Sequence, residues 1–125
     1  MLFDTDVLIW VQRGHAKAAA LIDSCKEPSI SIYTYMELLQ CAHNKTQHKV
    51  IRSFLKETGF KTLALNEAIG HRAAVYVEEY GLSHALRAGD AIIAATAVEN
   101  NLPLCSANRK HFDYLQELDL VVFKP

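Results

Sequence analysis

The sequence predicts an α/β domain with three layers, in which helices cover both faces of a central parallel sheet of five strands. Short apolar segments that suit buried strands alternate with longer segments of helical periodicity along the 125 residues. Acidic residues follow several of these strands at the points where helices are expected to begin, as at the ligand sites of open α/β sheets. The length predicts a single domain over residues 1–125.

Apolar patterning and turn residues place each element. Strands are expected at 1–3, 29–32, 60–65, 103–106 and 120–123, and helices at 7–13, 16–25, 34–42, 46–58, 66–80, 90–100 and within 108–118.

Capping signals define the helices of the first half. Asp6 is the expected N-cap of the first helix, and Gly14 ends it. Pro28 breaks the second helix before the second strand. Thr34 and Glu37 fit the capping box T-x-x-E of the third helix.

The second half has similar signals. Gly59 ends the fourth helix, and the strand that follows is expected at an edge of the sheet. Asn66 caps a long helix that Gly81 ends. The helix at 90–100 is too apolar all round for a surface position, so we expect it to be buried on several sides.

The composition is that of an ordinary globular protein, with half of the residues hydrophobic and a net charge of −1. This balance by itself predicts neither a nucleic-acid nor a membrane partner, and a nucleic-acid ligand requires a local basic patch. No apolar run approaches the roughly 20 residues of a membrane span. Because no C-x-x-C pair occurs, we expect core or near-core thiols in a reducing cytoplasm at Cys25, Cys41 and Cys105.

Three acids stand at or just inside expected helix starts: Asp4, Glu37 and Asp90. Three carboxylates in one place repel each other unless a cation neutralises them, and hard oxygen ligands suit Mg²⁺ or Mn²⁺. Taken singly, Glu37 and Asp90 also suit ordinary helix capping. Asp4 is harder to explain in that way, because it ends an apolar strand and Asp6 already suits the cap.

Around these acids the sequence resembles the PIN-domain ribonucleases, and within them the VapC-type toxins. The matching pieces are L-F-D-T-D-V-L-I-W at 2–10, S-I-Y-T-Y-M-E-L at 31–38, R-A-G-D-A-I-I-A-A-T-A at 87–97 and S-A-N-R-K-H-F at 106–112. Each piece alone is weak, but the four in this order and spacing cover nearly the whole chain. The resemblance implies the strand order 3-2-1-4-5.

The resemblance also implies an activity and partners. It implies an endoribonuclease that depends on Mg²⁺ or Mn²⁺, in which Asp4, Glu37 and Asp90 hold the metal and form the catalytic site. In the implied reaction, a metal-activated water attacks the phosphorus of an RNA phosphodiester in line. A cytoplasmic homodimer is implied as well, held inactive by a VapB-like antitoxin whose tail commonly fills the acidic groove.

The fourth matching piece departs from the family pattern. The family often has another acid there, whereas this chain has Asn108 and His111, and Asp113 falls two residues late. One fewer negative charge predicts weaker binding of a second metal ion. We expect Asn108 to hold a water or to orient Asp4, and Asp6 to support the site as a cap that faces it.

Several basic residues flank the acids and are candidates for phosphate contacts at the rim: Arg13, Arg87, Arg109 and Lys110. For any one of them, a solvated surface charge is the plainer interpretation.

Other functions share parts of this pattern. A haloacid-dehalogenase-type phosphatase shares the D-x-D start and the late G-D, but it needs a further acid where this chain has Ala94 and a lysine closer than Lys61. A receiver domain needs an Asp at the end of the third strand, where Leu65 and Asn66 stand. A PIN-fold protein that binds RNA or a partner protein without cutting is supported by the missing fourth acid, and the three acids together argue against it.

Overall fold

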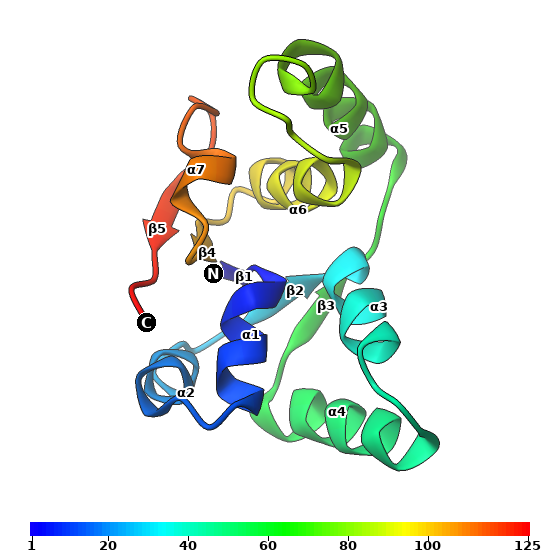
Figure 1. The fold of residues 1–125 in the computed structure, drawn as a ribbon, viewed down its shortest axis with the longest axis vertical. Helices are drawn as coiled ribbons and strands as arrows, with labels where there is room; N and C mark the ends of the chain where they lie inside the picture. Colours follow the sequence, from blue (N-terminus) through cyan, green and yellow to red (C-terminus); the bar gives the residue numbers. More distant parts are fainter.

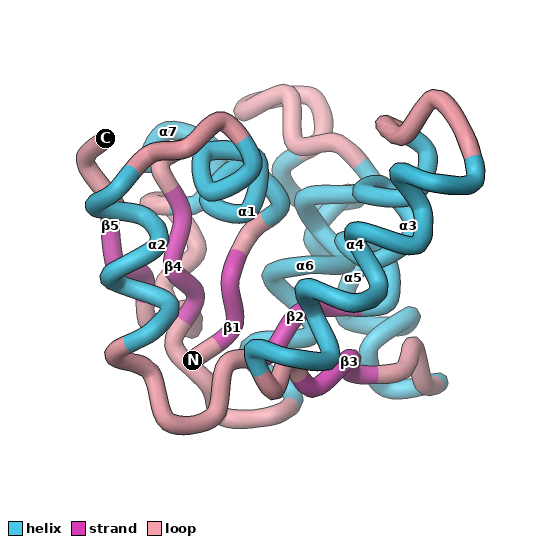
Figure 2. Tube along the Cα trace, turned by 90° about the horizontal axis from the view of Figure 1, so that it is seen from below, coloured by secondary structure: helices cyan, strands magenta, loops and turns pink.

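The computed structural model describes residues 1–125 and confirms the predicted class. Five parallel strands form one sheet in the order β3-β2-β1-β4-β5, with helices on both faces (Figures 1 and 2). The strand order that the resemblance implies is therefore confirmed. The elements are β1 (Leu2–Phe3), α1 (Thr5–Gln12), α2 (Ala16–Asp23), β2 (Ser29–Ser31), α3 (Ile32–Gln40), α4 (Lys45–Thr58), β3 (Lys61–Leu63), α5 (Glu67–Tyr80), α6 (Ala88–Glu99), β4 (Leu104–Ser106), α7 (Arg109–Phe112) and β5 (Leu120–Val122).

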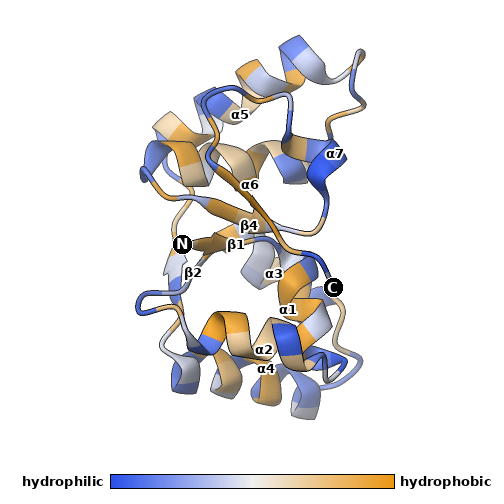
Figure 3. Cartoon of the chain, turned by 90° about the vertical axis from the view of Figure 1, so that its left-hand side faces the viewer, coloured by the Kyte–Doolittle hydropathy of each residue, from blue (hydrophilic) through white to orange (hydrophobic).

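The central strand β1 divides the core into two halves. Leu2 packs with α5, α6 and α7 on one face of the sheet, whereas Phe3 packs with α1, α2, α3 and α4 on the other. Successive side chains of a strand point to opposite faces, so this two-residue strand contributes to both cores. Figure 3 shows β1 and β4 as apolar strands at the centre of the molecule and α7 as a hydrophilic helix beside them.

The prediction that Asp6 caps the first helix is wrong, because α1 begins two residues earlier. Asp4 has extended backbone angles and accepts a hydrogen bond from the Thr5 amide, so Asp4 is the N-cap. The strand therefore passes into the helix with no intervening loop. As a result, Asp4 ends the strand and caps the helix at once.

The predicted capping box of Thr34 and Glu37 is also wrong. Helix α3 begins at Ile32, and its N-cap is Ser31, whose hydroxyl accepts from the Thr34 amide at 3.0 Å. Thr34 is buried inside the helix, and Glu37 lies one turn beyond it. The side chain of Glu37 is therefore available for another partner.

Helix α6 begins at Ala88 rather than at Asp90, and its N-cap Arg87 makes no side-chain capping bond. Asp90 lies in the first turn without capping the helix. The rest of α6 is buried as predicted, with five fully or almost fully buried apolar residues: Ala91, Ile93, Ala94, Ala95 and Ala97.

Other predictions differ only at their ends. Strand β3 lies at an edge as expected but is shorter than 60–65, and α2 and α7 are shorter than the predicted spans. Asn66 caps α5, and Gly59 ends α4 with a φ of 78°, which favours glycine. None of the helices combines the length and apolar character needed to cross a membrane.

All three cysteines are free, but they differ in environment. Cys105 is fully buried, and burial raises the pKa of its thiol to about 11. Cys41 is exposed, so the expectation of a core or near-core thiol is wrong there.

We therefore expect a thiol reagent to label Cys41 first and to leave Cys105 unmodified in the native protein, because only the exposed thiolate reacts readily. Mass spectrometry of peptides after brief alkylation checks this order, with fully denatured protein as the control that labels all three. Equal labelling of Cys41 and Cys105 under native conditions contradicts it.

Candidate active site

A cleft of about 480 Å³ lies at the carboxyl end of the sheet, where α1, α3, α6 and α7 meet. It contains all three acids that the sequence singles out, Asp4, Glu37 and Asp90, together with Asp6. They come from the β1–α1 junction, from the middle of α3 and from the first turn of α6. The topology thus brings together acids that are far apart in the sequence.

Asp4 lies deepest, with only 6% of its surface exposed. One carboxylate oxygen accepts from the Thr5 amide at 2.8 Å, and the other accepts from the Ser106 hydroxyl at 2.7 Å. Burial, and then the charge of nearby Asp6, raise the pKa of Asp4 to about 7. An ionised Asp4 is therefore costly unless positive charge approaches it.

Asp6 faces the same cleft from the first turn of α1. Its Oδ2 accepts from the Ala107 amide at 3.0 Å, whereas its buried Oδ1 has no hydrogen-bond partner. Burial raises the pKa of this carboxyl as well. Because Oδ1 is buried and accepts no hydrogen bond, it is available to bind a cation. A cation would also offset the cost of burying the negative charge of this carboxylate.

Glu37 is held by a buried group of hydroxyls. The Thr5 hydroxyl donates to Glu37 Oε1 at 2.6 Å and lies 3.0 Å from the Thr34 hydroxyl. Thr34 in turn lies 3.3 Å from the Ser31 hydroxyl at the end of β2. This chain of contacts connects the starts of α1 and α3, so it fixes Glu37 relative to Asp4.

Asp90 is positioned by α7 and by the packing of α3 against α6. His111 Nδ1 lies 3.3 Å from Asp90 Oδ2. A Cβ atom built on the adjacent Gly89 would overlap the ring of Tyr33, so glycine is what allows that ring to pack there. Burial raises the pKa of Asp90.

The donor set suits a hard divalent cation, although its members do not form a closed cage. No group of three or more His, Cys, Asp or Glu side chains lies close enough together to hold a metal ion. Mg²⁺ commonly keeps several waters and takes one or two carboxylates plus substrate phosphates, so a closed cage is not required. The raised pKa of Asp4 and the unpartnered Oδ1 of Asp6 both fit a cation at this position.

The other predicted site residues divide into two groups. Arg87 and Asn108 line the cleft, and the Asn108 amide donates to Ser106, the residue that holds Asp4. The remaining basic candidates do not line it. Arg13 lies over the Trp10 ring, and Arg109 pairs with Asp113 at 3.7 Å; Lys110 is exposed on α7.

Sequence reasoning missed Thr5, Ser106 and Tyr33 as site residues. Thr5 and Ser106 each donate a hydrogen bond to a carboxylate of the cleft. Tyr33 also lines the cleft. Its burial, and then the charges of Glu37 and Asp90, raise the pKa of the Tyr33 hydroxyl. The positions of Thr5 between two acids and of Ser106 at the start of S-A-N were the available signals.

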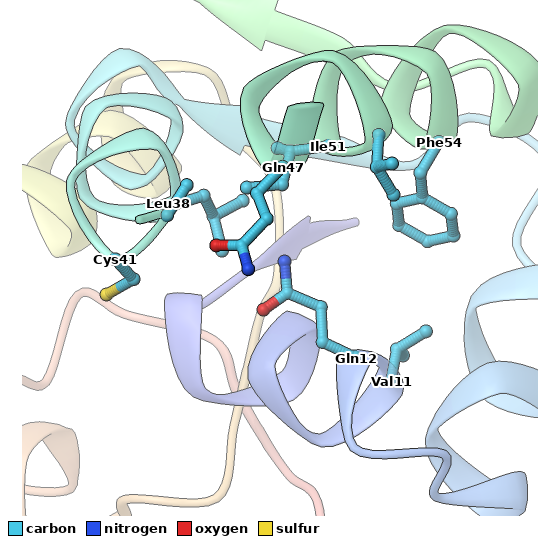
Figure 4. Close-up of a pocket in the computed structure, with 9 residues that line it drawn as sticks. Val11, Gln12, Leu38, Cys41, Gln47, Ile51 and Phe54 are labelled. Atoms are coloured by element: carbon cyan, nitrogen blue, oxygen red, sulfur yellow. The ribbon is translucent and has the colours of Figure 1, made fainter. Parts of the chain in front are cut away.

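A second cavity of about 470 Å³ lies on the other side of α1, between that helix, α3 and α4 (Figure 4). Its lining is mostly apolar, and the amide groups of Gln12 and Gln47 point toward one another across it. It contains none of the acids, so it is separate from the acidic cleft.

The fold and the acidic cleft agree with the comparisons with known proteins. A family model for the PIN domain matches residues 1–118. The chain belongs to the PIN domain family. Its similarity to other PIN domain proteins therefore extends over strands β1 to β4, the helices and all the acids of the cleft.

Individual relatives of this PIN domain cover almost its whole length. Ribonuclease VapC10 of Mycobacterium tuberculosis (strain CDC 1551 / Oshkosh) is 30% identical over 122 residues, which are 94% of this chain and 90% of the relative. A chain of a toxin-antitoxin complex from Klebsiella pneumoniae is 29% identical, with a TM-score of 0.81, over 97% of this chain and 95% of that one. A chain of VapBC2 from Rickettsia felis bound to a promoter DNA fragment, at 19% identity, 98% coverage of both chains and a TM-score of 0.79, shows the fold alone.

Proposed function

We propose that this PIN domain is a metal-dependent endoribonuclease, the VapC-type toxin of a toxin–antitoxin pair. The observation that carries the proposal is the single cleft that Asp4, Glu37 and Asp90 line, in which the buried carboxyl of Asp4 has a pKa of about 7. The homologous VapC10 is a ribonuclease, which supports RNA as the substrate.

In this proposal the residues of the chain prepare the site for a phosphodiester. Asp4, Glu37 and Asp90 hold Mg²⁺ or Mn²⁺, which when bound supplies the Lewis acid that activates water and stabilises the leaving oxygen. Ser106 and Thr5 orient the first two acids through their hydroxyls. No serine, cysteine or histidine nucleophile is required.

The cleft also contains a positive charge that can bind a phosphate of the RNA backbone. Arg87 lines the cleft beside Asp90 and is the basic candidate positioned to contact a phosphate. Asp6 and Asn108 support the site through the segment that holds Asp4, since Asp6 accepts from the Ala107 amide and the Asn108 amide donates to Ser106. Arg13, Arg109 and Lys110 lie farther out, where they can contact only RNA that extends beyond the cleft.

The partners follow from the same proposal. A VapB-like antitoxin inhibits the protein, as the toxin-antitoxin complex from Klebsiella pneumoniae supports, and two copies of the chain form a homodimer. The cytoplasm suits a ribonuclease with three free cysteines.

Incubation of the purified, antitoxin-free protein with a mixed RNA pool tests the proposal. We expect cleavage with Mg²⁺ or Mn²⁺ and none with EDTA. Asp90→Asn should remove cleavage, whereas Asp113→Asn, which changes an acid outside the cleft, should leave it unchanged. Metal-dependent RNA binding without any cleavage would instead establish the PIN-fold binding protein that the missing fourth acid supports.

Thr5→Val is expected to slow cleavage about ten- to hundred-fold, because it removes the hydroxyl that orients Glu37 while keeping the shape of the side chain. The metal concentration for half-maximal rate should rise as well. Cleavage rates measured across a Mn²⁺ titration check both effects.

Thr5→Ser keeps the hydroxyl and should restore most of the rate. Thr58→Val is a matched control, because the Thr58 hydroxyl bonds only a backbone carbonyl on α4. A Thr5→Val protein with the wild-type rate and metal dependence shows that Glu37 does not need this contact.

A further inference from the structure

Three aromatic rings gather beside the acidic cleft without belonging to it. We name Tyr80, His84 and Tyr114 the aromatic platform. His84 stacks on Tyr114 with a centroid distance of 4.0 Å and an interplanar angle of 25°. Tyr80 packs against both rings, at 4.9 Å from Tyr114 and 5.6 Å from His84. Tyr80 is the last residue of α5, His84 belongs to the segment between α5 and α6, and Tyr114 follows α7. Figure 1 shows these two connecting segments in light green and orange.

Two segments connect the aromatic platform to the cleft. His84 is three residues before Arg87, and Tyr114 is three residues after His111; both Arg87 and His111 line the cleft. Three residues span at most about 10 Å. Burial, and then the charge of Asp90, raise the pKa of Tyr114, which agrees with this closeness.

The segment that carries His84 is held in a defined conformation. The amide of His84 donates to the Tyr80 carbonyl at 2.9 Å, and Leu86 anchors the segment in the core. Ala85 between them has a φ of 53°, an unusual value for a residue other than glycine or asparagine. The Ser83 hydroxyl lies 2.8 Å from His84 Nδ1, so the imidazole is also held at its polar edge.

His84 nevertheless remains exposed, although Tyr114 beneath it is half-buried. The exposed ring is thus fixed in orientation and supported from below. An exposed aromatic surface that is already ordered loses little entropy when a flat ligand stacks on it. Every nucleobase presents such a flat face, and stacking on aromatic residues is how proteins bind unpaired bases.

We propose that the aromatic platform binds an unpaired base of the RNA, next to the cleaved bond, by stacking on His84. This inference rests on the proposed function, because RNA in the cleft is what brings a base to this place. It makes His84 a residue that selects substrates with an accessible, unpaired nucleotide at one position. Base identity matters little, since all four bases have a stacking face.

The test uses short single-stranded RNAs that carry the fluorescent base 2-aminopurine at each position in turn, since stacking quenches its emission. The RNAs are added to Asp4→Asn protein in EDTA, so that cleavage does not interfere. We expect strong quenching at one position. Adding His84→Ala should abolish that quenching and weaken binding about five-fold or more, within the range for loss of one stacked base.

Two further variants separate stacking from other causes. His84→Phe keeps a flat ring and should retain the quenching and the affinity, and His71→Ala changes an exposed histidine on α5 and should have no effect. Quenching that persists in His84→Ala, or equal losses in His84→Ala and His84→Phe, overturns the proposal. So does a His84→Ala protein that binds RNA normally but binds its antitoxin weakly, because the segment then contacts protein.

This readout is independent of the proposed nuclease activity. Metal-dependent cleavage by the wild type without His84-dependent quenching leaves the nuclease standing and refutes the aromatic platform. Quenching that depends on His84, in a protein that cuts no RNA, supports the aromatic platform and refutes the nuclease.

Discussion

Asp4→Asn is expected to abolish metal-dependent RNA cleavage and, at the same time, to stabilise the metal-free protein. The buried carboxylate of Asp4 is placed for a cation, and without one its charge lies close to Asp6 and Asp90. An amide keeps the size of the side chain and removes that charge. We expect cleavage to fall about a thousand-fold or more and the unfolding temperature to rise by roughly 10 °C at pH 7.5.

Cleavage rates and thermal unfolding of the wild type and the variant, both measured on EDTA-treated protein before metal is added back for the cleavage assay, check the two effects. Asp113→Asn serves as the control, because this half-exposed acid pairs only with Arg109. A variant that loses activity and also loses stability shows that Asp4 has a structural role instead.

The second large effect is the dependence of stability on pH. The pKa of Asp4 rises from 3.8 to about 7 on folding, so the native state binds an extra proton between these values. Its contribution to stability is present at pH 4 and below and is lost as the pH rises to 7. Each pKa unit corresponds to about 1.4 kcal/mol, so the loss amounts to a few kcal/mol.

The difference in unfolding free energy between Asp4→Asn and the wild type isolates this contribution. It should be small at pH 4, grow toward pH 7 and then level off, as measured by urea unfolding without metal. Millimolar Mn²⁺ should stabilise the wild type more at pH 8 than at pH 5, because binding requires the ionised carboxylates. A difference that is constant with pH, or equal stabilisation of both proteins by Mn²⁺, contradicts the explanation.

The sequence was enough to predict the layers and most of the elements, but not where three of the helices, α1, α3 and α6, begin. Asp6 and the T-x-x-E pattern are good local capping signals, and both lie after the true starts. In β1–α1 and β2–α3 the strand passes directly into the helix. The cap is therefore a polar residue at the strand's end: Asp4 directly after β1, and Ser31 as the last residue of β2. How far a strand pairs depends on its neighbours in the sheet, which local signals do not contain.

The acids of the cleft could be predicted because each stands at a recognisable place in the chain. The residues that orient them could not, since their contacts are long-range. The Ser106 hydroxyl donates to Asp4, which is 102 residues away in the sequence. The Thr5 hydroxyl at the start of α1 donates to Glu37 on α3. Serine and threonine are also so common at helix starts that their types alone do not indicate a site.

The central claim is that three acids from separate segments act as one site. Its most direct test is the metal-dependent cleavage rate of one mapped RNA by Asp4→Asn, Glu37→Gln, Asp90→Asn and the triple variant. Residues that act as a unit are strongly non-additive, so each single variant should lose nearly as much activity as the triple variant. Partial losses that multiply to the triple value, or any single variant with the wild-type rate, would contradict a shared catalytic centre.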